Sequence, residues 1–100
     1  MSTLDPHAPN NTDRIALSNQ LYELAESFAL EATLWPQPEA QLNLARSGRQ
    51  LAEVARQLLS ARADFAKAQA FAEAATLIYR NVVATRRFFA ALMHEPKTSR

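Results

Sequence analysis

The chain has 100 residues, a formal net charge of +1, 48% apolar residues and 21% charged residues, which is the balance of a folded domain rather than of a disordered segment. The chain contains twenty alanines and thirteen leucines but only two isoleucines, three valines and one glycine. This composition excludes most β architectures, because these need β-branched residues in their strands and glycines in their turns. The absence of cysteine excludes disulfides, thiolate metal sites and cysteine nucleophiles.

Both ends of the chain are predicted to be flexible tails. Residues 1–11 contain two prolines and two asparagines but few large apolar side chains, so they cannot offset the entropy lost on ordering. Residues 96–100 are polar, which leaves residues 12–95 as the folded domain. The first residues lack the pattern of a signal peptide, and no apolar run approaches the roughly 20 residues of a membrane span. We therefore expect a cytoplasmic protein without a membrane partner.

The first helix is predicted over residues 12–34. Asn11 or Thr12 can cap its start, and the Trp35-Pro36-Gln37-Pro38 segment must end it, because a residue before proline is driven to extended geometry. The glutamates at 23, 26 and 31 are interpreted as a solvated face. The apolar positions recur at three- and four-residue steps, as in a helix that packs against another helix: Leu17, Leu21, Leu24, Phe28, Ala32 and Trp35.

The second helix is predicted over residues 38–61, with Pro38 at its first position. Gly48 leaves its continuity open, because Ser47 and Gln50 have the spacing of a capping box that would begin a new helix. Leu44 and Leu51 nevertheless lie one heptad apart, and the apolar pattern passes Gly48 without changing phase. A continuous helix is favoured.

The third helix is predicted over residues 64–94, with Asp64 as its N-cap and a tight turn within residues 60–64. Its apolar seam follows a regular heptad pattern and consists of Phe71, Ala75, Ile78, Val82, Thr85, Phe89 and Leu92. The predicted fold is all-α, a three-helix up-down-up bundle. The alternative is a long helical hairpin completed by dimerisation. The residues expected to form the core are Phe28, Leu51, Leu58, Ile78, Val82 and Phe89.

The apolar arc of the third helix covers about two thirds of its circumference, more than the roughly 100° that a surface helix needs. Either Leu77 and Phe88 contact two neighbouring helices of the same bundle, or the surplus face is an interface with another molecule. For the second interpretation the candidate interface residues are Leu77, Phe88, Ala84 and Ala91. A run of alanines near the start of this helix is either a tight packing face or a consequence of alanine's helix propensity.

Basic residues gather in the second half of the chain, which has eight bases and four acids against three bases and six acids in the first half. Arg80, Arg86 and Arg87 could form a basic patch for phosphate or for an acidic partner. The simpler interpretation is that an acidic first helix packs beside basic ones. A sequence pI of 8.2 is low for a nucleic-acid-binding domain, so nucleic acid is the less favoured partner.

No enzymatic chemistry, cofactor or metal site is predicted. His7 and His94 have no paired ligand at metal-binding spacing, and a single glycine excludes recognisable phosphate loops. No family motif can be matched. We therefore expect a small non-enzymatic accessory or regulatory factor of bacterial or phage type, which binds a protein partner or forms a homodimer.

Two alternatives to this function stay open. One is a small nucleic-acid-associated regulator that uses the arginine-rich third helix. The other is a cavity for an apolar small molecule, for which the lining candidates are Phe28, Trp35, Phe71, Tyr79 and Phe89.

Overall fold

A computed structural model describes residues 11–60 and 62–93, and within these ranges it contains helices and no strands. The helices are α1 (Asn11–Thr33), α2 (Pro38–Gln57) and α3 (Phe65–Met93). The all-α prediction is confirmed. The predicted tails, residues 1–11 and 96–100, lie outside the described residues except for Asn11, which is the first residue of α1.

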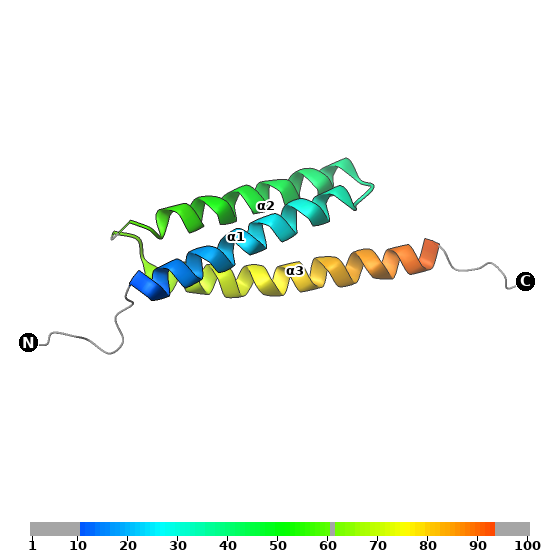
Figure 1. Cartoon of the computed structure of the whole chain (residues 1–100). Coiled ribbons are helices and arrows are strands. Elements are labelled where there is room, and N and C mark those ends of the chain that lie inside the picture. The colour runs from blue at the N-terminus through cyan, green and yellow to red at the C-terminus, as the bar shows by residue number, and fades with distance from the viewer. Residues whose placement is uncertain (1–10, 61, 94–100) are drawn as a thin grey trace, which may run out of the picture.

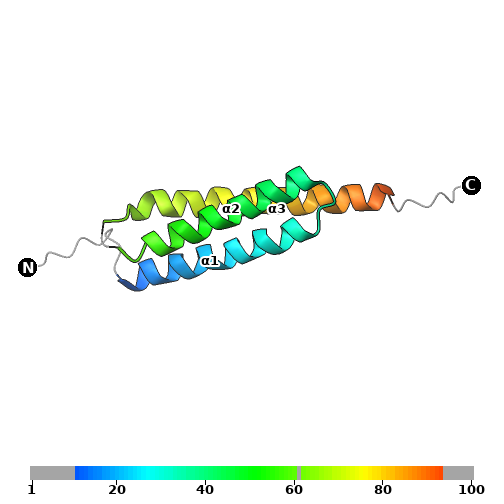
Figure 2. The same ribbon diagram turned by 90° about the horizontal axis from the view of Figure 1, so that it is seen from above.

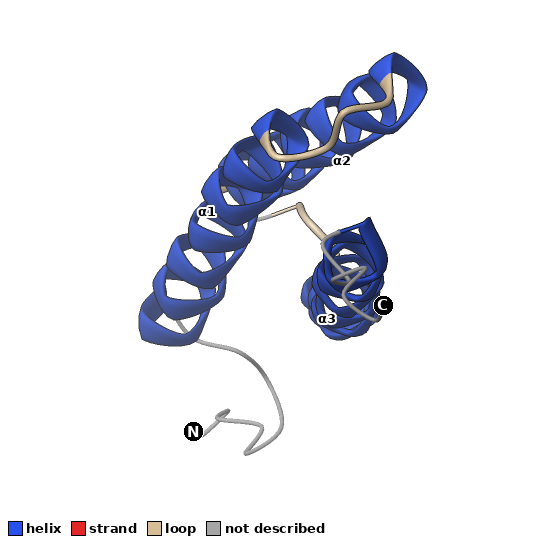
Figure 3. Ribbon diagram, turned by 90° about the vertical axis from the view of Figure 1, so that its right-hand side faces the viewer, coloured by secondary structure: helices blue, strands red, loops and turns tan. Residues whose placement is uncertain are grey.

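The helices follow the up-down-up order, with α1 and α3 running in one direction and α2 in the other (Figure 1). α1 and α2 lie along each other as a hairpin, whereas α3 packs mainly against α1 and hardly touches α2. The last turns of α3 run beyond the connection between α1 and α2 (Figure 2). Seen along its axis, α3 stands apart from the layer that α1 and α2 form (Figure 3).

Local sequence signals set the helix ends. Pro38 is at the start of α2, and Gln37 before it has extended backbone angles of φ −82° and ψ 126°. Asp64 caps α3, since its Oδ1 accepts a hydrogen bond from the Lys67 backbone N–H at 3.1 Å. α2 passes through Gly48 without a break, as predicted, and the turn within residues 60–64 is also confirmed. α2 ends at Gln57, four residues earlier than predicted.

The early end of α2 coincides with contacts from α1. The Arg14 Nη1 atom lies 3.3 Å from the carbonyl oxygen of Ala63 and 3.4 Å from that of Ser60, so one guanidinium holds the connection between α2 and α3. Ser18 Oγ donates a hydrogen bond of 2.8 Å to the carbonyl oxygen of Ala55. That carbonyl belongs to the last turn of α2, where carbonyls lack partners within the helix.

The α1–α2 hairpin has a close-packed core of its own. Leu21 and Phe28 of α1 are fully buried, as are Leu51 of α2 and Leu58, the residue that directly follows α2. The helices approach each other closely at Gly48, where a Cβ atom would lie 3.0 Å from the carbonyl oxygen of Ala25. Large side chains above and below this point therefore pack into one another across a short distance.

α3 turns its small residues toward the hairpin. Ala68, Ala72 and Ala75 are buried, so these three alanines of the run form a packing face. The predicted burial of Ile78 and Phe89 is wrong, since they are 54% and 51% exposed, and Val82 is half-buried. The physical reason is that α1 and α2 already bury their large side chains against each other, and a thin alanine face allows α3 to approach α1. The other core predictions, Phe28, Leu51 and Leu58, are confirmed.

We predict that Gly48→Ala destabilises the protein although alanine is the better helix former. The gain in helix propensity is about 1 kcal/mol, whereas forcing a methyl group against a fixed backbone carbonyl costs about 1–3 kcal/mol. Chemical denaturation monitored by circular dichroism measures the difference. Asn43→Ala, at an exposed position of the same helix, is the matched control and should be neutral or stabilising. A Gly48→Ala variant more stable than the wild type would show that the two helices can move apart at no cost.

Candidate functional site

One side of α3 is a continuous exposed strip with little polar character, which we call the outer face. Its residues recur at heptad spacing, and every one is exposed: Ala70, Phe71, Ala74, Leu77, Ile78, Asn81, Ala84, Thr85, Phe88, Ala91 and Leu92. None of them carries a charge. The side chains of Asn81 and Thr85 are the only polar ones in the strip.

The large side chains of the outer face are exposed to an unusual degree. Leu77 and Phe88 are each 61% exposed, and Ile78 and Leu92 are 54% and 52% exposed. The Phe88 ring lies 5.9 Å from the ring of Phe89, its exposed neighbour, measured between centroids. The four residues predicted as an interface, Leu77, Phe88, Ala84 and Ala91, thus all lie on one accessible face. Their binding to a partner stays a prediction.

The rotation of α3 about its axis is fixed by a buried carboxylate near the end of α1. Glu31 is only 2% exposed, and its carboxylate accepts hydrogen bonds from Nε and, at 3.1 Å, from Nη2 of Arg86. Trp35 Nε1 donates a further bond of 3.1 Å to the same carboxylate. The hydrogen bond to Glu31 raises the pKa of the Arg86 guanidinium, because the carboxylate favours its charged form. The prediction that Glu31 lies on a solvated face is wrong.

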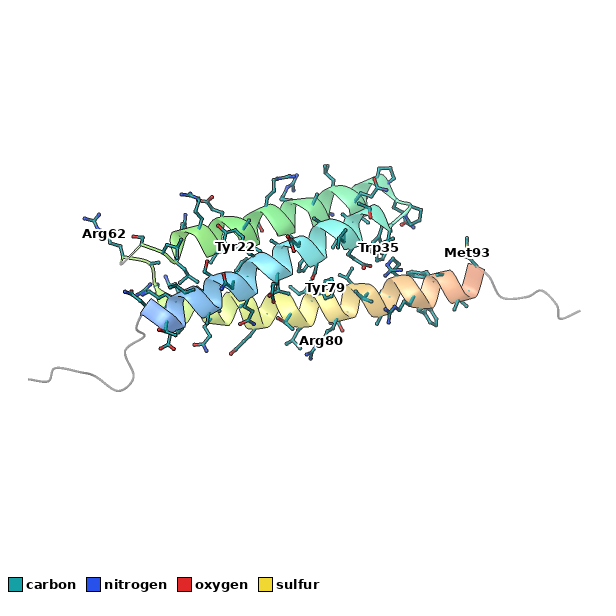
Figure 4. All side chains as sticks on the ribbon, in the orientation of Figure 1. Tyr22, Trp35, Arg62, Tyr79, Arg80 and Met93 are labelled. Atoms are coloured by element: carbon teal, nitrogen blue, oxygen red, sulfur yellow. The ribbon has the colours of Figure 1, made fainter. Side chains whose placement is uncertain are left out.

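An aromatic contact joins the same two helices. The rings of Phe28 and Tyr79 lie 5.5 Å apart between centroids at a tilt of 59°. Tyr79 lies between α3 and α1, whereas Arg80 points away from the hairpin (Figure 4). Tyr79, Arg86 and the buried alanines therefore define the inner side of α3, and the outer face lies largely opposite to them.

The structure separates the three arginines of the predicted basic patch. Arg80 and Arg87 are exposed, but the side chain of Arg86 is 22% exposed and is paired with Glu31. The pair also shows an acidic first helix packed beside a basic third one, as the simpler interpretation expected. Arg80 and Arg87 remain as two exposed cations at heptad spacing, next to the outer face.

Two open grooves lie beside the helices, and the second meets the outer face at Phe71. One, of about 1210 Å³, is lined by α1 and α2 alone, and its walls are mostly small residues such as Ala25, Ala45 and Gly48. The other, of about 540 Å³, lies at the connection between α2 and α3. Of the aromatic residues considered for an apolar ligand cavity, only Phe71 lines this second groove. Phe28 is instead buried against Tyr79.

Other classes of site can be assessed within residues 11–60 and 62–93. No group of three or more histidine, aspartate and glutamate side chains there is arranged to hold a metal ion. No helix in the same ranges combines the length and apolar character needed to cross a membrane. Comparison with protein-family models, with curated proteins and with solved structures finds no match to this chain. Its function is therefore inferred from its own residues.

The sequence interpretation missed Arg14, Ser18 and Glu31, the polar residues that connect the helices. Glu31 had a signal that could have revealed it, because Leu17, Leu24 and Glu31 are separated by seven residues and so share one side of α1. A carboxylate that continues an apolar seam requires a partner. Arg14 and Ser18 bond to backbone carbonyls, whose positions the sequence does not indicate.

We predict that Arg86→Met lowers the thermal midpoint by about 4 °C or more, because Glu31 would remain buried with the Trp35 indole as its only described partner. Methionine keeps much of the apolar stem of arginine, so the loss reports the charge pair. Arg46→Met, at an exposed position of α2, is the control and should leave the midpoint unchanged. Differential scanning calorimetry measures both, and equal midpoints for the two variants would contradict the proposed role of Glu31.

Proposed function

We propose that this protein is a non-enzymatic interaction or accessory factor that binds a protein through the outer face of α3. The observation that carries the proposal is the uncharged, heptad-spaced strip on a helix whose opposite side already packs on α1. A solvated helix face ordinarily carries charged residues. The polar residues of α3 instead lie mainly beside the strip, at Glu73, Arg80 and Arg87.

The size of the exposed apolar surface supports a docking role. A large apolar side chain has on the order of 150–200 Å² of surface, and the large apolar residues of the outer face are 36–61% exposed. Together they present several hundred Å², which matches or exceeds the largest apolar patch of a typical monomer. Patches of this size mark interaction sites more often than they occur by chance on a monomer.

Charge and composition support the same proposal. The strip itself carries no charge, so a phosphate backbone could contact only the few exposed cations beside it or at its end, such as Arg80, Arg87 and Lys67. A nucleic acid is therefore the weaker candidate partner. Cysteine-free composition favours a reducing compartment, and we propose the cytoplasm as the place of action.

We predict that Leu77→Glu and Phe88→Glu retain the helical circular dichroism of the wild type, and its unfolding midpoint at a concentration where the wild type is monomeric, because both side chains are 61% exposed. Each should weaken association, since a charge would be buried in the interface. Analytical ultracentrifugation over a range of concentrations reports association. Phe28→Ala, in the hairpin core, is the contrasting variant and should cost about 3–5 kcal/mol of unfolding free energy.

Loss of helicity in both glutamate variants would contradict the proposal. It would mean that the outer face is required for folding of the single chain and is not a surface left for a partner.

A further inference from the structure

We infer that the outer face of α3 binds the outer face of a second copy of this chain, with the two α3 helices antiparallel. The inference rests on the proposed docking role and specifies its partner. Three observations on the described residues support it: the pattern of the strip, the charges beside it, and its area.

The strip is complementary to itself when one copy is reversed. In an antiparallel helix pair, residues at heptad position a of one helix face residues at heptad position d of the other. A two-fold axis between residues 79 and 80 brings Phe71 opposite Phe88 of the partner subunit and Ala74 opposite Thr85 of the partner subunit. Each ring then meets a ring, and each small residue meets a residue of moderate size. A parallel pair would instead place Phe71 against Phe71, and Phe88 against Phe88.

The charges beside the strip select the antiparallel orientation. Glu73 and Arg87 lie on the same side of α3, two heptads apart, and are exposed. The same two-fold axis places Glu73 beside Arg87 of the partner subunit, and it does so twice by symmetry. In a parallel pair this flank of one copy would lie on the opposite side of the interface from the same flank of the other, so Glu73 and Arg87 of the two copies would not meet. Arg80 lies beside its own copy only in the antiparallel pair, and the two Glu73–Arg87 contacts on either side of it offset this like-charge contact.

Asn81 lies close to the proposed axis and is one of the two polar side chains of the strip. The two copies of Asn81 would come within reach of each other, where each amide can donate and accept a hydrogen bond. A single asparagine in an apolar helix seam fixes register and orientation at some cost in stability. Its position near the middle of the strip favours a symmetric partner.

The available area is close to what a stable dimer needs, which is about 800 Å² from each partner. The large apolar side chains of the outer face supply about half of that area or somewhat more, and its alanines, Asn81 and Thr85 add to it. The hairpin lies on the other side of α3, as the buried positions of Ala68, Ala72 and Ala75 show. Two copies can therefore pair through α3 without a clash between their hairpins.

Disulfide trapping tests the arrangement, because the chain has no native cysteine. Ala74→Cys and Thr85→Cys variants are prepared separately, mixed, and oxidised. We expect a disulfide-linked heterodimer of the two variants, because these positions face each other across the proposed axis. Ala74→Cys alone should cross-link poorly, since its two copies would be several residues apart along the helices. Gln69→Cys, exposed on another side of α3, is the control for random collision.

Charge exchange gives an independent test. Glu73→Arg should weaken dimerisation several-fold, because it would place like charges together at both ends of the interface. The double variant Glu73→Arg with Arg87→Glu should restore the wild-type dimerisation constant. Restoration by the double variant is expected only if these two positions face each other across the interface.

Each outcome bears on a separate claim. A wild-type chain that stays monomeric at millimolar concentration, with folded Leu77→Glu and Phe88→Glu variants, would overturn the second copy as partner and leave the docking face in place. A dimer in which Ala74→Cys cross-links efficiently with itself would overturn the antiparallel arrangement. Unfolding of both glutamate variants would overturn the docking face as well.

Discussion

The contact between Glu31 and Arg86 determines which side of α3 faces water. A carboxylate that is 2% exposed must be paired, and Arg86 supplies the charge from α3. Arg86 lies on the same side of α3 as Tyr79 and the buried alanines, so this contact and the alanine packing require the same rotation of the helix. Turning α3 to bury Leu77 or Phe88 would remove Arg86 from Glu31. The exposure of the outer face is therefore a consequence of polar pairing as well as of packing.

The hairpin explains why the remaining apolar surface of α3 finds no place within one chain. Around Gly48, α1 and α2 come close enough to bury Phe28 and Leu51 in a shared core. On the side that α3 contacts, two helices packed this closely leave little room for a third row of large side chains. The open groove lined by α1 and α2 has no α3 residue in its walls. α3 therefore reaches the hairpin through Ala68, Ala72 and Ala75. Its larger residues lie on the sides that this narrow contact does not cover.

The sequence predicts the elements of this fold better than their faces. The prolines around Trp35 and the cap at Asp64 act over a few residues, so helix boundaries follow from local chemistry. Periodicity also revealed that α3 is apolar around most of its circumference, but it does not indicate which part of a wide arc meets the hairpin. Ile78 and Phe89 were therefore assigned to the core, whereas the structure exposes them. The candidate interface residues Leu77, Phe88, Ala84 and Ala91 do lie on the exposed side, because they flank that seam.

The width of the apolar arc fits a helix that has two neighbours on different sides. About one third of the circumference of α3, around Ala72 and Tyr79, packs on α1. A second third, centred near Asn81, is the outer face, and the polar side with Glu73 and Arg87 completes the circle. Packing within one chain explains the third of the circumference that contacts α1. Contact with water explains the third that carries the charged residues. The outer face, whose large side chains are half exposed or more at Ile78 and Phe88, has no neighbour within the described chain, and we propose that a second molecule covers it. Burying it would restrain α3 from both sides, so association would also stabilise the packing of α3 on its own hairpin.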